Sequence, residues 1–269
     1  MLKLDQVSFA YSPEFSLHEI NFSVDHGEFV AIVGKNGSGK TTLTRVIMAL
    51  TPIESGHVFW HGRDLAGSEP ADLARFMGYV FQNPDLIFFH STAEEEVAYG
   101  LRQLKVEPKK IQQHVTQAFA AVELTGQEKK NPRLMTKGEK QRLAIACTLA
   151  MEPELYLLDE PTCGQDMPFR DKLMTMLTGL CHQGKSILVV THDMEIVEKF
   201  ASRVLVLNQG NLVFDGSPTQ LFKDIKQALS WGLKVSDANV LSQNLANVGI
   251  SPTGSLTQLA EQIRLRRGQ

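Results

Sequence analysis

The sequence has little excess charge of either sign. It contains 27 Lys and Arg against 30 Asp and Glu, which gives a formal net charge of -3 at pH 7. Proteins that bind nucleic acid by electrostatic attraction neutralise phosphates with many Lys and Arg side chains. The charge of this chain argues against binding of that kind, and we expect no nucleic-acid partner.

Cysteine is also scarce. The 269 residues include three cysteines, Cys147, Cys163 and Cys181, and no two of them form a CxxC pair. An odd number of widely spaced cysteines argues against a secreted fold held together by disulfides. We expect a reducing cytosol and small, mostly buried apolar side chains at these positions.

Long apolar runs are missing as well. The densest ones, "FVAIVG" and "LAIACTLAM", are far shorter than the ~20 residues that a membrane-spanning helix needs. The first residues, "MLKLDQVSFAY", lack the basic stretch followed by an apolar stretch that marks a secretory signal. We therefore expect a chain that neither spans a membrane nor begins with a signal peptide.

The sequence does contain alternating strand and helix patterns. Hydrophobic residues make up 43% of the chain and charged residues 21%, which is enough for a packed core. Strand patterns occur in the first sixty residues and again at "FMGYVFQNP", "ELYLLDE", "SILVVTH" and "RVLVLNQG". Between about Thr92 and Met151 the apolar spacing becomes helical, and the last fifty-odd residues form short helical pieces. The pattern predicts an α/β core with an inserted helical subdomain.

A glycine-rich segment follows the apolar strand "FVAIV" and opens a helix. This segment, "GKNGSGKTT", fits the pattern G-x-x-x-x-G-K-[ST] in the context that the pattern requires. The backbone N–H groups of such a loop surround phosphate oxygens, Lys40 reaches the terminal phosphates, and the Thr41 hydroxyl binds Mg²⁺. The predicted nucleotide-binding residues here are Gly34, Lys35, Asn36, Gly37, Ser38, Gly39, Lys40, Thr41 and Thr42.

Two carboxylates end the buried strand in "LYLLDEP". Burying them is costly unless they meet a cation or water. Asp159 suits a magnesium ligand, direct or through water, and Glu160 is then free to polarise an attacking water as a general base. Without the phosphate loop, a surface turn with two acids would be an equally good interpretation.

Three further polar or aromatic residues lie at or near strand ends. His192 ends the strand in "VVTHD", and Gln82 ends "GYVFQ", where its amide can bind Mg²⁺ or hold a water. A lone strand-end histidine is more often a packed core residue, but strand carboxyl ends are where open α/β sheets bind ligands. We predict catalytic roles for both. Tyr11, in "SFAY", is a candidate platform for stacking a base, although an ordinary strand aromatic fits nearly as well.

The segment "MTKGEKQR" places three cations at the start of a predicted helix. A helix N-terminus already carries partial positive charge, so these cations are unfavourable there unless they face water or an anion. The structural interpretation is a solvated loop, and the functional interpretation is that an anion binds at this point.

In this order, the motifs resemble those of the ATPase subunits of the ATP-binding cassette (ABC) family. They are the phosphate loop, a glutamine after a strand, the segment "MTKGEKQR", "LLDEP", "TCGQD" and "THD", and they cover most of residues 1–220. The resemblance implies a P-loop NTPase core of ABC type, with an N-terminal antiparallel β subdomain and an inserted helical subdomain at about residues 84–151. It also implies ATP hydrolysis with Mg²⁺ and head-to-tail dimerisation, so that each ATP lies between two subunits.

"MTKGEKQR" resembles the family's signature L-S-G-G-[QE]-x-Q-R, so the implied anion is the γ-phosphate of the partner's ATP. The implied contacts are Thr136, Gly138 and Glu139. Lys137 departs from the pattern, standing where the first glycine allows close backbone approach, and it either weakens docking or adds favourable charge. Gln165 stands where leucine is usual.

Within the family, "FQNPDLIFFHSTAEEEVAYGL" and "LKVSDANVLSQNLANVGI" resemble the ATPases of energy-coupling factor (ECF) transporters. The implied function is import of a vitamin or transition-metal ion, powered from the cytoplasmic face of the cell membrane. The implied partners are a second ATPase, an integral membrane coupling protein and a membrane protein that captures the substrate. The implied domains are residues 1–216, which bind ATP, and residues 217–269, which form a C-terminal helical dimerisation domain.

Other functions remain open from the sequence. An ordinary importer with two permease subunits is the main alternative. ABC ATPases of DNA repair carry very long coiled coils and those of translation carry two cassettes, and this sequence shows neither. A small-molecule kinase would need no signature segment. The apolar stretch after Gln82 further predicts that Phe88 and Phe89 meet a helix of the membrane protein, since exposed apolar patches usually mark partner surfaces.

Overall fold

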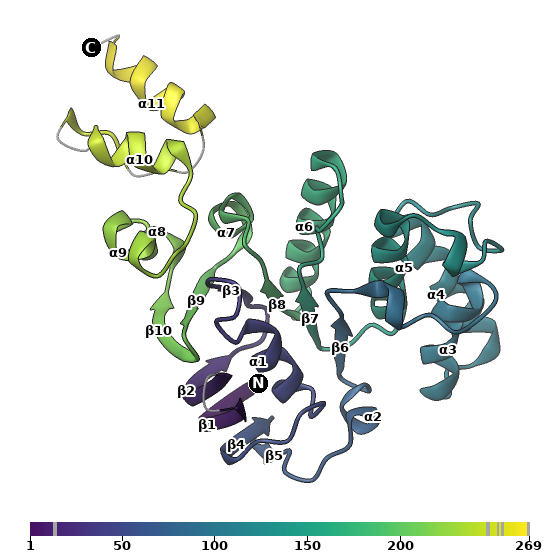
Figure 1. The fold of residues 1–269 in the computed structure, drawn as a ribbon. Helices are drawn as coiled ribbons and strands as arrows, with labels where there is room; N and C mark the ends of the chain where they lie inside the picture. Colours follow the sequence, from purple (N-terminus) through teal and green to yellow (C-terminus); the bar gives the residue numbers. More distant parts are fainter. Residues whose placement is uncertain (13–14, 246–247, 252, 254–255, 268–269) are drawn as a thin grey trace.

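A computed structural model describes residues 1–12, 15–245, 248–251, 253 and 256–267 of the chain. Within them, a small antiparallel sheet has the strand order β2-β1-β4-β5 (Figure 1). The register of β1 with its two neighbours shifts at several points, as at β-bulges, which bend a strand locally. Its strands are β1 (Leu2–Ser12), β2 (Phe15–Val24), β4 (Ser55–Trp60) and β5 (Arg63–Asp64).

The larger sheet has the strand order β10-β9-β3-β8-β7-β6, in which only β10 runs antiparallel to its neighbour. Each residue of β3, β7 and β8 is buried, as expected for parallel strands with both faces covered. The strands are β3 (Phe29–Val33), β6 (Met77–Val80), β7 (Leu155–Asp159), β8 (Ser186–Val190), β9 (Arg203–Asn208) and β10 (Asn211–Gly216).

Strand alternation divides the core into two layers. Val30 and Ile32 of β3 face a cluster with α1 and the small sheet, so α1 lies between the two sheets. Ala31 and Val33 face the other way, into a cluster shared with the helices of the main body other than α1 and α2. The helices of this body are α1 (Lys40–Ile47), α2 (Pro70–Leu73), α3 (Ala93–Gln103), α4 (Pro108–Ala121), α5 (Lys137–Ala150), α6 (Met167–His182) and α7 (Met194–Phe200), with 3₁₀ turns η1 (Pro84–Leu86) and η2 (Pro132–Leu134).

Helices α3, α4 and α5 form the predicted helical subdomain, which lies beside the end of β6 (Figure 1). Expectation and structure agree on the mixed α/β core, the antiparallel subdomain and this insertion. One predicted helical piece, "TQLFKDIKQAL", is divided in two, because the Asp224 side chain accepts from the Gln227 N–H and starts a new helix. None of the helices in the described residues is long and apolar enough to cross a membrane.

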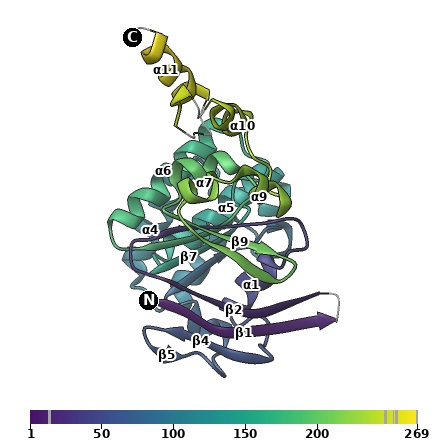
Figure 2. The same ribbon diagram turned by 90° about the vertical axis from the view of Figure 1, so that its left-hand side faces the viewer.

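The segment after β10 packs in two different ways. Leu221, Phe222 and Leu233 join the core of the main body, whereas Ala238 and Leu259 belong to a small separate cluster. The separate cluster therefore begins after Leu233, later than the predicted boundary at residue 217. Figures 1 and 2 show its helices projecting beyond the rest of the chain. The elements are α8 (Pro218–Leu221), α9 (Ile225–Ser230), α10 (Asp237–Asn244) and α11 (Leu256–Arg267).

Candidate functional site

The loop between β3 and α1 can form only with glycine at particular positions. A Cβ at Gly34 would lie 2.1 Å from the carbonyl oxygen of Leu207, and one at Gly39 would lie 2.7 Å from a methyl group of Leu17. Gly39 also has φ of 104°, a backbone conformation that side chains disfavour. The loop thereby delivers the N-terminus of α1, with its unpaired N–H groups, to the carboxyl edge of the large sheet.

Lys40 is the first residue of α1, and its ammonium group turns back into the loop. Its Nζ donates to the carbonyl oxygens of Gly34 at 2.9 Å and Lys35 at 2.8 Å. Burial lowers the pKa of Lys40, partly opposed by the nearby charges of Glu160 and Asp159. A buried ammonium held by neutral carbonyls is well placed to exchange them for an anion.

Thr41 and Asp159 join the loop to the end of β7. The Thr41 hydroxyl donates to one carboxylate oxygen of Asp159 at 2.7 Å. The other oxygen, Oδ1, is buried and has no hydrogen-bond partner within the described chain. Burial raises the pKa of Asp159, since it penalises the charged form. A hydroxyl and an unsatisfied carboxylate form an oxygen donor set of the kind that Mg²⁺ prefers, so these residues fit the ion.

Glu160 follows directly and adopts a strained backbone. Its φ is 51°, which is uncommon for a residue other than glycine and is often found at functional sites. Its backbone N–H donates to the carbonyl oxygen of Val190 at 3.0 Å, which ties the turn to β8. The carboxylate oxygen Oε1 lies 2.9 Å from Nδ1 of His192, whose side chain is 67% exposed. His192 is therefore a solvent-facing partner of Glu160 and not a packed core residue.

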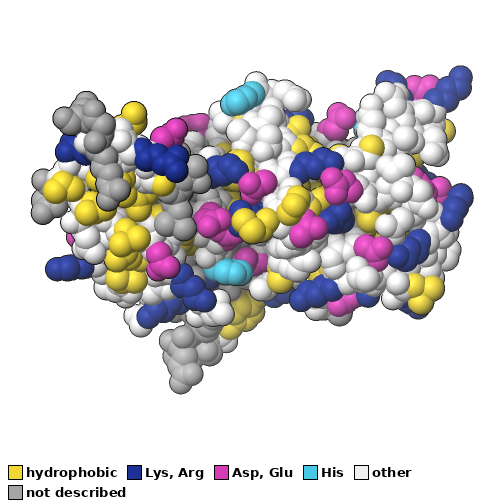
Figure 3. All heavy atoms as spheres, turned by 90° about the horizontal axis from the view of Figure 1, so that it is seen from above, with side chains coloured by type: hydrophobic (Ala, Val, Ile, Leu, Met, Phe, Trp, Pro, Cys, Tyr) yellow, Lys and Arg dark blue, Asp and Glu magenta, His cyan; other side chains and the backbone are white. Residues whose placement is uncertain are grey.

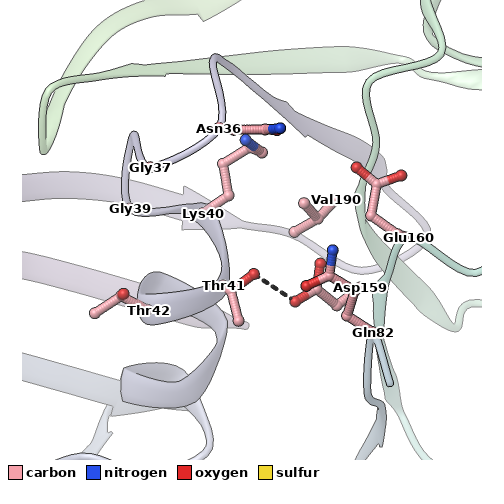
Figure 4. A pocket seen from close by; sticks show the side chains of 10 residues that line it. All are labelled: Asn36, Gly37, Gly39, Lys40, Thr41, Thr42, Gln82, Asp159, Glu160 and Val190. Carbon is pink, nitrogen blue, oxygen red and sulfur yellow. Dashed lines mark hydrogen bonds between the residues drawn. The ribbon is translucent and has the colours of Figure 1, made fainter. Parts of the chain in front are cut away.

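Lys40, Thr41, Asp159 and Glu160 line one open pocket of about 200 Å³ (Figure 4), whereas His192 is not among its lining residues and reaches it only through Glu160. Within it, the side chain of Thr42 points away from Asp159 and Glu160. Gly34, Lys35 and Ser38 belong to the same loop without lining the pocket. The lining residues are Asn36, Gly37, Gly39, Lys40, Thr41, Thr42, Gln82, Asp159, Glu160 and Val190.

The sequence analysis did not select Val190, the last residue of β8, although Val190 directly precedes the "THD" segment. It also missed Tyr79, whose hydroxyl lies 3.0 Å from the hydroxyl of Thr44 in α1. Burial raises the pKa of Tyr79 to about 12, so its hydroxyl stays protonated and links β6 to the helix. The alternation of β6 marks Tyr79 as a neighbour of buried residues but does not reveal which helix it meets.

Tyr11 lies outside this pocket. Its side chain is 56% exposed at the end of β1, where its ring meets Phe9 edge-on with centroids 4.5 Å apart. Base stacking stays a prediction for Tyr11.

Thr136, Gly138 and Glu139 lie in the helical subdomain, at the start of α5, and the pocket does not include them. Thr136 caps the helix, and its backbone N–H donates to the Glu139 carboxylate at 2.7 Å. Lys130 also donates to this carboxylate, and mainly this bond lowers the pKa of Glu139 to about 2. The Glu139 side chain is thus bonded at the helix start, and the nucleotide contacts of Thr136, Gly138 and Glu139 stay a prediction.

The three cations of this segment have different surroundings. Lys140 pairs with Asp85 at 2.6 Å, and Arg142 pairs with Glu123 at 3.1 Å. Lys137 is exposed and forms no ion pair within the described part of the chain. Lys137 is therefore the cation of this segment that is free to meet a charge brought by another molecule.

Comparison with known proteins places the fold and the pocket in one family. The family model described as "ABC transporter" matches residues 17–163, which is more than half of the chain. The chain belongs to the ABC transporter family. Its large sheet, phosphate loop and helical subdomain form an ABC-type ATPase cassette.

Three relatives show the range of similarity. An energy-coupling factor transporter ATP-binding protein from Methanothermobacter thermautotrophicus is 34% identical, over 96% of this chain and 84% of that protein. The solved structure of cbiO1 from Clostridium perfringens, part of the ABC transporter complex cbiONQ, has a TM-score of 0.73 and 29% identity, with 89% and 97% of the chains covered. A dimeric cassette bound to ADP and Pi has a TM-score of 0.74 and 28% identity, with 81% and 99% covered.

Some relatives are much longer than this chain. The cassette spans 41% and 39% of the length of two Methanosarcina proteins to which it is 35% identical. In those proteins it corresponds to one part of a longer chain.

Proposed function

We propose that this chain is the ATP-hydrolysing subunit of an ECF-type importer and that it powers uptake of a vitamin or a transition-metal ion. The observation that carries the proposal is the pocket, where a phosphate loop, Asp159 and the Glu160–His192 pair meet at the carboxyl edge of the large sheet. The similarity to an ECF ATPase and to cbiO1 supports the choice of transporter.

ATP binds with its phosphates at the start of α1. The unpaired N–H groups of the loop donate to phosphate oxygens, and Lys40 exchanges its loop carbonyls for the terminal phosphates. Thr41, Asp159 and Gln82 are the residues that would hold Mg²⁺. When bound, the ion neutralises charge that develops on the transferring phosphate.

Glu160 acts as general base toward the attacking water. Its carboxylate is mostly shielded from solvent but reaches the pocket, and His192 holds one of its oxygens from the solvent side. The strained turn at Glu160 fixes the direction of this carboxylate relative to the phosphate loop. His192 therefore orients the base. A carboxylate held in place accepts a proton of the attacking water as the water oxygen bonds to the γ-phosphorus and the bond from that phosphorus to ADP breaks, so that ADP leaves.

A second ATPase subunit completes each site. Thr136 and Gly138 start α5 away from the pocket of their own chain. The Thr136 N–H is bonded to Glu139, so the groups that can donate to a nucleotide held by another subunit are the Thr136 hydroxyl and the Gly138 N–H. Beyond the cassette body, Val240, Leu241 and Val248 are exposed apolar residues around α10, and apolar side chains gather at this end of the molecule in Figure 3. This surface supports the proposed role of the C-terminal helices in joining the two ATPases.

An aromatic surface on the helical subdomain is the proposed contact for the membrane coupling protein. Phe89 is 59% exposed and meets the ring of Tyr99 edge-on, with centroids 5.0 Å apart. The buried carboxylate of Glu96 accepts the N–H groups of Phe89 and His90, which fixes the loop. Of the two predicted contact residues, Phe88 is half-buried and packs partly against the core cluster, so Phe89 offers the more exposed ring.

Purification of the tagged chain from membranes of its native host tests the proposal. We expect three co-purified proteins, namely a second ABC ATPase or a second copy, an integral coupling protein and a small substrate-capture membrane protein. A complex containing two permease subunits and no capture protein would contradict the ECF assignment and favour an ordinary ABC importer. Recovery of the chain with no membrane protein at all would contradict a transport function.

A further inference from the structure

Gln165 connects two segments that the proposed function assigns to different ATP molecules. Its side-chain amide donates to the backbone carbonyl of Gly138 at 2.9 Å, in the first turn of α5. Its carbonyl oxygen accepts from Nε of Arg142, one turn further along the same helix, at 2.9 Å. Both ends of the Gln165 amide are thus bonded to α5, and an apolar side chain at this position could form neither bond.

The other end of this connection leads directly to Glu160. The backbone N–H of Cys163 donates to the carbonyl of Glu160 at 3.1 Å, and that of Gln165 donates to the carbonyl of Thr162 at 3.1 Å. Two successive tight turns therefore join the strained glutamate to Gln165. Asp166 then caps α6 by accepting from the N–H of Phe169, so this short loop is held at both ends.

The first turn of α5 also approaches the loop closely. A Cβ at Gly138 would lie 3.1 Å from the carbonyl oxygen of Gly164, a distance that few side chains tolerate. Arg142 is fixed in turn, because its guanidinium group lies 3.8 Å from the ring centre of Phe169 and pairs with Glu123. The contact between α5 and the loop is therefore packed as well as hydrogen-bonded.

We propose that Gln165 is a positioning residue that makes the Glu160 loop and the start of α5 move as one body. Under the proposed function, Glu160 acts on the ATP of its own chain, while Thr136 and Gly138 contact the ATP of the partner. A change at one nucleotide is then transmitted to the other through the Gln165–Gly138 bond. This inference rests on the proposed function and adds a link within one chain between the two sites.

The first test uses the isolated chain with the non-hydrolysed analogue AMP-PNP and Mg²⁺, at a concentration where sedimentation shows monomers. Hydrogen exchange of residues 136–142 is measured with and without the nucleotide. We expect the nucleotide to change exchange in this segment of the unmodified chain, and Gln165→Met to abolish the change while binding AMP-PNP normally. Gln165→Glu should behave like Gln165→Met, since it retains the acceptor for Arg142 but cannot donate to Gly138. Gln183→Met, on the exposed end of α6, is the matched control.

The second test uses the assembled ATPase complex. We expect Gln165→Met to lower kcat about fivefold or more, as loss of at least one ordinary net hydrogen bond would do, with KM for ATP changed less than about twofold. In Gln165→Met, the hydrolysis rate should also depend less cooperatively on the ATP concentration. A purely structural defect would not produce this change.

Several results would overturn the inference. One is that nucleotide does not change the exchange of residues 136–142 in the unmodified chain, or still changes it in Gln165→Met. Another is that Gln165→Glu behaves as the unmodified chain does. A third is that Gln165→Met leaves kcat and cooperativity unchanged. If Gln165→Met does not fold, Gln165→Leu replaces it under the same criteria. A chain that does not bind AMP-PNP at all would instead overturn the proposed function, and the inference with it.

Discussion

At the scale of the residue, the pocket contains two ionisable groups that burial disfavours in their charged forms. Burial lowers the pKa of Lys40 and raises the pKa of Asp159. The folded chain therefore retains charged groups that would be better solvated in the unfolded chain, as is common where groups are kept ready for a ligand. Under the proposed function, relieving this arrangement contributes to the binding of Mg²⁺ and phosphate.

Asp159 should make the chain less stable as pH rises. Its folded pKa lies above the ordinary value of 3.8, so the folded state binds more protons than the unfolded state between these two values. The free energy of unfolding then falls as pH rises through that window. In urea titrations without nucleotide or Mg²⁺, we expect the stability of Asp159→Asn relative to the unmodified chain to increase from about pH 4.5 to about pH 8.

Asp171 provides the control with the opposite sign. A hydrogen bond from Lys199 lowers the pKa of Asp171, so its stabilising effect is complete above the ordinary value and is lost only in acid. The stability gap between Asp171→Asn and the unmodified chain should therefore stay constant over the same range. A gap for Asp159→Asn that stays constant or moves the other way would contradict the account of Asp159.

At the scale of the element, the loop between β6 and α3 determines which aromatic rings face outward. Its chain is held by Glu96, a buried carboxylate of α3, and by the ion pair of Asp85 with Lys140 of α5. The loop thus contacts two helices of the subdomain, one of which begins with the signature segment. A partner bound to this loop would act on α5 through these same contacts.

Replacing the exposed rings should separate docking from nucleotide binding. We expect the double change Phe89→Ser and Tyr99→Ser to reduce recovery of the membrane partners and transport by on the order of tenfold or more, as loss of aromatic interface anchors does. ATP binding and the midpoint of thermal unfolding should stay unchanged, because both side chains are exposed. Pull-down and uptake assays in the native host measure the effect.

Two further variants complete this experiment. Leu50→Ser, at an exposed apolar position after α1, should leave docking intact. Phe88→Ser should lower the unfolding midpoint, since that ring packs against the core. Normal uptake by the double variant would place the docking surface elsewhere.

The sequence predicts these elements unequally well. The phosphate loop and the strand ends at Asp159 and His192 are local patterns, and parallel strands bring their carboxyl ends to one edge without further information. Adjacent aromatic residues are different, since nothing in the sequence distinguishes exposed Phe89 from packed Phe88. The bond between Gln165 and Gly138 joins residues far apart in the chain, and only tertiary packing brings them together. The packing of α8 and α9 on the main core likewise depends on long-range contacts.

At the scale of the whole molecule, one chain contributes to two ATP sites in the proposed head-to-tail dimer. Its phosphate loop, Asp159 and Glu160 serve one site, while the start of α5 serves the partner's site. The loop residues match the family pattern, but Lys137 replaces a glycine at the start of α5. This mixture supports a heterodimer with a homologous ATPase, in which the site that Lys137 completes turns over more slowly.

Restoring glycine at position 137 tests this asymmetry. With Glu160→Gln silencing the other site, Lys137→Gly should raise hydrolysis at the partner-loaded site by about two- to tenfold. Lys137→Ala removes the charge without allowing the closer backbone approach that only glycine permits. It also avoids the loss of helix stability that glycine causes. Unchanged or lower turnover in Lys137→Gly would mean that the lysine is tolerated, its ammonium contributing charge to the phosphate.

The central claim is that this chain's pocket hydrolyses ATP with Glu160 as the base. The most direct measurement compares ATP binding and turnover in the purified complex carrying Glu160→Gln, with Lys40→Ala as the companion variant. We expect Glu160→Gln to bind ATP normally and to lose hydrolysis on the order of 10²-fold or more at the site built on this chain, since the amide cannot accept the proton of water. Lys40→Ala should instead weaken ATP binding itself. Near-normal turnover at this site with Glu160→Gln would contradict the account.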